Sequence, residues 1–420
     1  MELVPRHVRP VPSQLGLYFK VGYNDHIDIG RSLASNPRWL SGIVLDPTLE
    51  DRHEEIRIQA AKCRLEIVLD TFAMELATLN GWTKTRSSLA WSGGQRNDPS
   101  DFTPTWISQF AGHLAHHVVS RGYTAVLAPT HFLDGPSSPW IDIDAALTLA
   151  LRESLDREVG CEISIHYPLA TSSGHIANQM ARSRLLTKLR SLPIESLWMR
   201  IHPFGTTSSG PIALRRYVEV CRDFHQLNVP MVAERTGTVG LSLLAIGAVG
   251  GIESGVTTGE SFDFGRLRRP RPRDGHGFRP SPRVYIGPLA TFLPRDRARS
   301  LFESGRMKAR LACNDTECCR RGATDMIARP GHHFLFQRMA EVQTLSQTPH
   351  HLRANQFLEE VIRPASDLLV QVTRIDPSFE KTRRRIEDWR TTVSSIVKES
   401  GMSTMSAAPR GRRTRHLRGA

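Results

Sequence analysis

The sequence predicts an α/β protein: a closed (β/α)8 TIM barrel, followed by a small helical module and a basic C-terminal tail. Two observations predict the barrel. Short apolar runs rich in Val, Ile and Leu alternate with amphipathic helical stretches, which is typical of a parallel sheet with helices on both faces. Eight such runs are present, the number of strands that closes this barrel. The length of 420 residues leaves room for one domain of that size with additions.

The expected strands and helices follow one another in a regular order. Residues 144–155 (DAALTLALRESL) repeat apolar side chains at helical spacing, and residues 212–227 follow Pro211, a residue favoured at the start of a helix. Residues 81–103 are polar with several glycines, so we expect an irregular excursion there. The eight expected strands span residues 16–22, 42–46, 65–70, 124–128, 162–167, 197–202, 230–234 and 249–253.

Beyond the barrel, the chain divides by composition. We expect the barrel over residues 1–260, an Arg/Pro-rich connecting segment over 261–300, a zinc-binding helical module over 301–375, and a basic helix with a disordered tail over 376–420. Expected elements of the last three parts are a strand at 283–287 and helices at 295–303, 334–345, 352–362 and from 376 onwards.

The positive charge is concentrated in two segments. The net charge is +13, while residues 266–283 hold seven arginines and one acidic residue, and residues 376–420 hold eleven basic and five acidic residues. Arginine-rich segments without a core suit the phosphates of tRNA or DNA, and solvated loops are the alternative. Arg268, Arg269 and Arg271 are therefore candidates for contacts with a nucleic-acid backbone.

The compartment is predicted from what the sequence lacks. The longest apolar run, residues 240–252, is shorter than a bilayer span, and the first residues (MELVPRHVRPVP) have no apolar signal-peptide core. We therefore expect a cytoplasmic protein with no membrane partner.

Polar residues gather where the expected strands end. In a parallel barrel these ends meet at one mouth, where the loops that carry the chemistry converge. Each residue alone is more often a satisfied hydrogen-bonding group than a catalyst, but the set predicts a site. The residues are Asp46, Asp70, His131, His166, His202, Glu234 and Glu253.

Three cysteines lie within the eight residues ACNDTECC. Cys313, Cys318 and Cys319 can supply three of the four thiolate or imidazole ligands that a structural zinc ion needs. A vicinal redox disulfide and free thiols are the alternatives. By the residues alone, the fourth zinc ligand is one of His332, His333, His350 and His351.

The order of motifs in this region resembles the tRNA-guanine transglycosylase superfamily. ACNDTECC is followed by GHHFLFQRMAEVQTL and then TPHHLRANQFLEEV. In that family three cysteines follow a TIM barrel, then a helix with a His-His pair, then a zinc-binding His in a Thr-x-His segment. The resemblance implies a structural zinc with His350 as the fourth ligand. The family spreads its cysteines as C-x-C-x-x-C, so the match leaves one of Cys318 and Cys319 unassigned.

The barrel carries a second resemblance to the same family. EIVLDTFAMELATL places Asp70 at the position of an active-site Asp, although Thr71 to Ala73 replace the family's glycines. In VPMVAERTGTVGLSLLAIGAVGGIESGV, Glu253 stands near the position of the nucleophilic Asp. The acidic residue expected after the fourth strand, which holds the guanine, is replaced by the stretch ending in His131.

The resemblance implies an exchange of guanine for a 7-deazaguanine-type base in tRNA or DNA through a carboxylate-linked glycosyl intermediate. We expect Glu253 as nucleophile and Asp70 as the acid that trades protons with the base, with Glu234, at the neighbouring strand end, as the substitute candidate. His131, His166 and His202 are further candidates for substrate contacts.

Two alternatives from other functional classes remain open. One is a non-catalytic, nucleic-acid-binding subunit of the same superfamily, in a homo- or hetero-oligomer. The other is a hydrolase with a metal at the barrel mouth held by the three histidines and Asp70, although the first expected strand lacks the HxH motif such enzymes use.

Overall fold

Eight parallel strands close into a barrel in the computed structural model, which describes residues 15–34, 39–256, 260–269 and 282–399. Strand pairing runs β1-β2-β3-β4-β6-β7-β9-β10 and returns to β1. The predicted (β/α)8 TIM barrel and its eight strands are therefore confirmed. The strands are β1 (Gly16–Lys20), β2 (Gly42–Leu45), β3 (Glu66–Leu69), β4 (Ala125–Leu127), β6 (Ser164–Ser172), β7 (Ser196–His202), β9 (Met231–Glu234) and β10 (Gly251–Gly255).

The barrel interior is filled by alternate side chains of these strands. Val44, Val68, Leu127 and Trp198 form one buried cluster with Tyr18 against it. Because successive side chains of a strand point to opposite faces, the intervening residues pack outwards against the helices.

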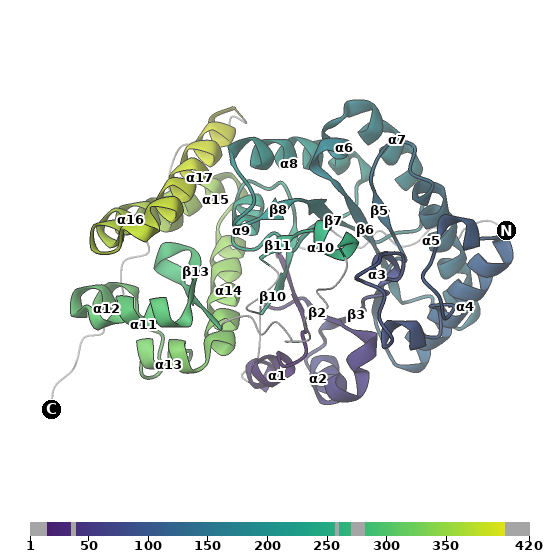
Figure 1. Ribbon diagram of the computed structural model, residues 1–420, viewed down its shortest axis with the longest axis horizontal. Coiled ribbons are helices and arrows are strands. Elements are labelled where there is room, and N and C mark those ends of the chain that lie inside the picture. Colours follow the sequence, from purple (N-terminus) through teal and green to yellow (C-terminus); the bar gives the residue numbers. More distant parts are fainter. Residues whose placement is uncertain (1–14, 35–38, 257–259, 270–281, 400–420) are drawn as a thin grey trace.

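Helices surround this barrel, as the apolar spacing predicted (Figure 1). The predicted helix 144–155 lies within α5, while 212–227 covers α8 from its second residue and the 3-10 turn His225–Leu227 after it. Residues 81–103 contain two short 3-10 turns, at Arg86–Ser88 and Pro99–Asp101. The helices on the barrel are α1 (His26–Ala34), α2 (Glu50–Lys62), α4 (Pro104–Ser120), α5 (Trp140–Arg157), α6 (Ser173–Ala177), α7 (Gln179–Leu189), α8 (Pro211–Phe224) and α9 (Val239–Ala245).

Four short elements lie near the carboxyl ends of the strands. β8 (Phe204–Gly205) pairs with β11 (Ser261–Phe262) in an antiparallel ladder. The other short elements near the mouth are α3 (Ala73–Leu76) and α10 (Gly265–Arg268), while β5 (Phe132–Leu133) extends the sheet beside β6.

A helical region follows the barrel and lies on the side away from α4, α5 and α7 (Figure 1). It begins with a hairpin and is joined to the barrel by α14, whose Phe334 ring meets that of Phe19 in β1 at 6.3 Å. Its elements are β12 (Arg283–Ile286), β13 (Thr291–Pro294), α11 (Arg295–Glu303), α12 (Gly305–Leu311), α13 (Ala323–Ala328), α14 (Pro330–Gln347), α15 (His350–Phe357), α16 (Arg363–Ile375) and α17 (Glu380–Glu399).

The last helix begins later than predicted. Asp376 accepts a hydrogen bond from the backbone N–H of Ser378 and caps a 3-10 turn over Pro377–Phe379, so α17 starts at Glu380. The tail expected to be disordered lies outside the described residues. No helix within the described ranges is both long and apolar enough to cross a membrane.

Candidate active site and metal centre

The three predicted acidic residues meet at the barrel mouth. Asp70 directly follows β3, Glu234 is the last residue of β9, and Glu253 lies in β10 beside Glu234 in the strand register. Each is only 2% exposed. Parallel strands bring their carboxyl ends to one edge, so residues distant in sequence become neighbours here.

Two cations, the partly exposed Lys20 and the buried Arg200, balance these acids, and sequence reasoning missed both. Lys20, at the end of β1, forms an ion pair with Asp70. Arg200, in β7, lies with Nη2 2.5 Å from Oε1 of Glu234. A signal was available, because a charged residue inside the apolar run SLWMRIH is costly to bury unless it is paired.

The neighbours of the acids push their pKa values in opposite directions. Burial alone would raise the pKa of Asp70, but the positive charges of Lys20 and Arg200 outweigh it and hold the pKa well below its usual range. Burial, and then the negative charge of Glu234, raise the pKa of Glu253 to about 7. At neutral pH Asp70 is therefore ionised, while the carboxyl group of Glu253 is partly protonated.

Three carboxylate oxygens in this group have no hydrogen-bond partner among the described residues. They are Oε2 of Glu75, Oε2 of Glu234 and Oε1 of Glu253, and all are buried. An unpaired buried acceptor costs about 1–3 kcal/mol. The arrangement is therefore suited to a ligand or water that donates hydrogen bonds into the mouth.

The segment from Ser261 to Arg268 covers one side of the carboxylates. The ring of Phe262 lies 5.9 Å from the guanidinium groups of both Arg200 and Arg235. Nδ1 of His202 accepts a hydrogen bond of 3.0 Å from the backbone N–H of Phe264. His202, predicted to contact substrate, thus anchors this segment with one ring nitrogen.

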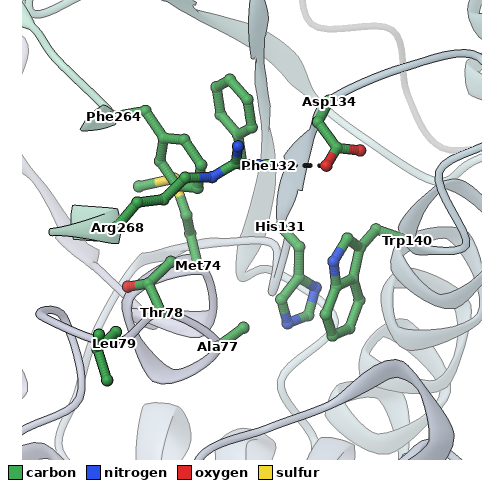
Figure 2. A pocket seen from close by; sticks show the side chains of 10 residues that line it. All are labelled: Met74, Ala77, Thr78, Leu79, His131, Phe132, Asp134, Trp140, Phe264 and Arg268. Carbon is green, nitrogen blue, oxygen red and sulfur yellow. Dashed lines mark hydrogen bonds and ion pairs between the residues drawn. The ribbon is translucent and has the colours of Figure 1, made fainter. Parts of the chain in front are cut away.

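A cavity of about 190 Å³ lies beside this segment and is lined in part by its Phe264 side chain (Figure 2). Its walls include His131, Trp140, Phe132 and Phe264, and Nη2 of Arg268 lies at its rim. Figure 2 shows the His131 ring beside the Trp140 indole, and Arg268 paired with Asp134. His131 and Arg268, both predicted to bind substrate, therefore share one cavity.

Two other arginines, Arg269 and Arg271, were predicted to contact a nucleic-acid backbone. Arg269 is exposed at the end of α10. Arg271, with the rest of residues 270–281, and the basic tail after residue 399 lie outside the described residues.

His166 does not lie at the mouth, which corrects the prediction from sequence. The expected strand ended at residue 167, but β6 continues to Ser172, so His166 lies near its start. Its Nε2 is 3.0 Å from Oε2 of Glu66 and its Nδ1 is 2.7 Å from Oγ of Ser196. Glu66 and Ser196 begin their strands, so this network fills the amino-terminal end of the barrel.

Pro168 lies inside the observed strand, beyond the end that was predicted. Proline normally interrupts a ladder because it lacks an N–H. Here Thr130 donates a hydrogen bond of 2.6 Å to the carbonyl of Pro168. That edge of β6 faces the gap between the pairing with β4 and the pairing with β5, where no N–H is needed.

The three clustered cysteines meet one histidine. Sulfur atoms of Cys313, Cys318 and Cys319 and a ring nitrogen of His333 lie within 4.8 Å of one another. Cys318, Cys319 and His333 are at most 3% exposed. Three thiols and an imidazole in this arrangement fit a closed structural zinc site, and both adjacent cysteines take part.

The fourth member of this group is His333, whereas the family resemblance implied His350. Nδ1 of His333 lies 3.4 Å from both Cys318 and Cys319 sulfurs. Its Nε2 lies 3.0 Å from the carbonyl oxygen of Tyr285, which can only accept, so Nε2 carries the hydrogen and Nδ1 is free to bind a metal. His350 is exposed and lines a different hollow, beside Gly247.

The loop that carries the cysteines is shaped by its own polar residues. Oδ1 of Asp315 accepts hydrogen bonds from the backbone N–H groups of Glu317 and Cys318. Hydrogen bonds from the thiols of Cys318 and Cys319 lower the pKa of Cys313. The hydrogen bonds with Cys313 raise the pKa of Cys318 and Cys319 in turn, so a metal ion would have to displace the protons of those two thiols.

Helix α14 connects the metal centre to the barrel. His333 lies in its first turns, and five residues later Arg338 is fully buried. Nη2 of Arg338 donates a hydrogen bond of 3.1 Å to Oγ1 of Thr238, at the start of α9. A metal ion held by His333 would therefore fix the helix that also contacts the loop after β9.

Comparisons with known proteins give likenesses in structure but not in sequence. No family model matches the chain, and no curated protein matches it. A Sargasso Sea enolase protein is 13% identical over 58% of this chain and 54% of its own, with a TM-score of 0.32. This chain thus spans about half of that enolase.

Two further solved structures are similar to a comparable degree. Xylanase 10B from Thermotoga petrophila RKU-1 in complex with xylobiose is 10% identical over 60% of this chain and 86% of its own, with a TM-score of 0.39. The YdjI aldolase from Escherichia coli K12 is 11% identical over 80% of this chain and 92% of its own, with a TM-score of 0.36. The barrel assignment itself comes from the strand pairing.

Proposed function

We propose that the chain is a transglycosylase of the tRNA-guanine transglycosylase superfamily, exchanging guanine for a 7-deazaguanine-type base in tRNA or DNA. One observation carries this proposal: Asp70 and Glu253 lie at one barrel mouth with pKa values displaced in opposite directions. Cleavage at a glycosidic carbon needs one ionised carboxylate and one group that moves a proton.

The pKa directions favour the opposite division of roles from the one expected from sequence. Asp70 is ionised and suits the nucleophile, which attacks the anomeric carbon while the bond to the leaving base breaks. Glu253, with a pKa of about 7, suits the acid that gives its proton to that base. The incoming base then returns a proton to Glu253 as its nitrogen displaces Asp70. Glu234 remains the substitute for either residue.

The proposed polymer substrate is supported by charge. Arg266 and Arg268 have side chains 83% and 56% exposed, close to the mouth, and Arg269 follows them. The sequence after these residues adds four more arginines before residue 284. Guanidinium groups concentrated in one stretch of sequence match the negative charge of a nucleic-acid backbone.

The proposed zinc ion is structural in this scheme. The thiol and imidazole ligands leave no position open, and the group lies at α14 instead of the mouth. No chemical step passes through it. Its contribution is to hold α14 against the barrel, while Asp70 and Glu253 act on the substrate.

One alternative is favoured by a specific observation. Asp70 forms an ion pair with Lys20 and Glu234 forms one with Arg200, so both carboxylates already have charged partners within the protein. A non-catalytic nucleic-acid-binding subunit is therefore the second candidate. The metal-dependent hydrolase is not favoured, because within the described ranges the only group able to hold a metal is the cysteine cluster.

Incubation with labelled guanine and either bulk tRNA or DNA tests the proposal. Zinc-loaded wild-type protein should incorporate label. The rate of incorporation should be at least about 100-fold lower for Asp70→Asn and for Glu253→Gln. Glu158→Gln, at a half-exposed residue on the far end of α5, is the matched control and should keep full activity.

A second readout separates the two carboxylates. Denaturing gels should show a covalent complex of nucleic acid with wild-type protein, and none with Asp70→Asn. If the folded, zinc-loaded wild type incorporates no label into either polymer, yet binds them, the non-catalytic alternative replaces this proposal.

A further inference from the structure

The loop after β1 carries an exposed aromatic side chain. Tyr23 is 61% exposed, and of the Phe, Tyr and Trp residues that the structure describes it is the only one that is neither buried nor half-buried. It lies three residues after Lys20, the partner of Asp70, and therefore on the mouth side of the barrel. A single exposed apolar side chain is ordinary, so its significance depends on how it is held.

The turn that carries Tyr23 is closed at its base. Oδ2 of Asp25 accepts a hydrogen bond of 3.0 Å from the backbone N–H of Gly22, and the backbone N–H of Asp25 donates one of 3.2 Å to the carbonyl of Gly22. A β-carbon at Gly22 would lie 2.6 Å from that Oδ2, so glycine leaves the room that the contact needs. Two hydrogen bonds thus fix the backbone on which the ring stands.

Arg52, in α2, holds the same turn from the side. Its Nε donates a hydrogen bond of 2.7 Å to the carbonyl of Tyr23, and its Nη2 donates one of 3.1 Å to Oδ1 of Asn24. The guanidinium carbon lies 4.0 Å from the centroid of the Tyr23 ring, so the planar cation covers one face of the ring. Because one face is covered and 61% of the residue is exposed, the opposite face is open to a partner.

An open ring face on a fixed turn is suited to stacking. A base in a single strand offers a free face to an aromatic side chain, whereas a base inside a duplex is covered by its neighbours. Tyrosine loses little conformational freedom on binding, because it has few side-chain torsions. Exposed Arg266 and Arg268, also near the mouth, supply the charge that a phosphate backbone requires.

We propose that Tyr23 is a stacking platform for an unpaired base of a nucleic acid, a base other than the one that is exchanged. Arg52 is the positioning residue, which holds the turn and backs the ring. The inference rests on the proposed function for the class of its partner, a nucleic acid. It does not rest on the proposed chemistry, since Asp70 and Glu253 take no part in it.

Guanine-free probes test the platform apart from any exchange. Fluorescence anisotropy measures binding to oligo(dT) and oligo(U), and to the duplexes that these strands form with their adenine complements. Tyr23→Ala should weaken binding to the single strands at least about fivefold, the value of one stacked base, and should leave binding to the duplexes unchanged. Tyr23→Trp should bind the single strands as tightly as wild type or more tightly.

Three results would overturn the platform. They are an equal loss for single strands and duplexes in Tyr23→Ala, no loss for either, and no binding of wild type to either single strand. Ile58→Ala, at another exposed apolar residue of α2, is the control and should match wild type.

A charge-preserving variant tests the role of Arg52. Arg52→Lys keeps the positive charge but loses the planar contact and the paired hydrogen bonds. It should also weaken binding to the single strands, with an unchanged dependence on salt concentration. Wild-type affinity in Arg52→Lys would overturn the positioning role.

The labelled-guanine assay keeps this inference apart from the proposed function. If wild type incorporates label while Tyr23→Ala binds single strands normally, the platform fails and the exchange stands. If wild type incorporates nothing but loses single-strand binding in Tyr23→Ala, the exchange fails and the platform stands.

Discussion

Substituting His333 by alanine is expected to weaken zinc binding by about two to three orders of magnitude. Structural zinc sites of this kind contribute roughly 10–16 kcal/mol, so one ligand of four accounts for about 3–4 kcal/mol, and each 1.4 kcal/mol is a tenfold change in affinity. The variant also leaves the carbonyl of Tyr285 without its 3.0 Å partner, which adds to the loss.

Zinc content and chelator competition measure this change. Wild type should hold one zinc per chain, and cobalt substitution should give the absorption of a tetrahedral site with thiolate ligands. His333→Ala should lose zinc to the chelator at a far lower concentration. The temperature of thermal unfolding should also fall in this variant, because α14 loses its attachment to the cysteine loop.

Two neighbouring histidines provide matched controls. His350→Ala tests the ligand implied by the family resemblance, and His332→Ala tests the residue adjacent to His333. Neither side chain belongs to the group of possible ligands, so both variants should keep wild-type zinc affinity. Retention of zinc by His333→Ala together with its loss from His350→Ala would refute the reasoning.

Three further predictions follow from charge. Because the pKa of Glu253 is raised to about 7 in the folded state, the folded protein holds a proton that the unfolded chain has already lost. The free energy of unfolding should therefore fall as pH rises from about 5 to 8. Glu253→Gln should remove this fall, which amounts to roughly 3 kcal/mol in urea unfolding above pH 7. Asp70→Asn leaves Lys20, whose side chain is 18% exposed, without its charged partner and should cost roughly 1–3 kcal/mol by the same measurement, whereas an unchanged stability would contradict this pairing. Nucleic-acid binding should weaken steeply as the salt concentration rises. Neutralising Arg266, Arg268 and Arg269 should lower the slope of the logarithm of the binding constant against the logarithm of salt concentration by about 2–3. An unchanged slope would exclude these contacts.

The carboxylate site was predictable because it depends on topology. Once eight parallel strands are recognised, residues at their carboxyl ends must converge, and Asp70, Glu234 and Glu253 do so. The cations that set their protonation were not predicted. Whether Arg200 faces the barrel interior depends on the register of β7, which its own sequence does not specify.

His166 illustrates the limit of local patterns. Its assignment to the mouth depended on where one strand ends, and that strand continues through Pro168 to Ser172. The fold accommodates the longer strand, because the side chain of Thr130 donates a hydrogen bond to the Pro168 carbonyl at a gap in the ladder.

The sequence by itself determined the barrel, the helical region after it and the three cysteines of the metal group, since hydrophobic period and ligand clustering are local properties. Only the tertiary structure decided that His333 and not His350 completes that group, and that Arg52 holds the turn of Tyr23. The physical reason is the same in both cases. A ligand or a hydrogen-bond partner is chosen by the direction in which a helix presents its side chains, and packing against the rest of the chain sets that direction.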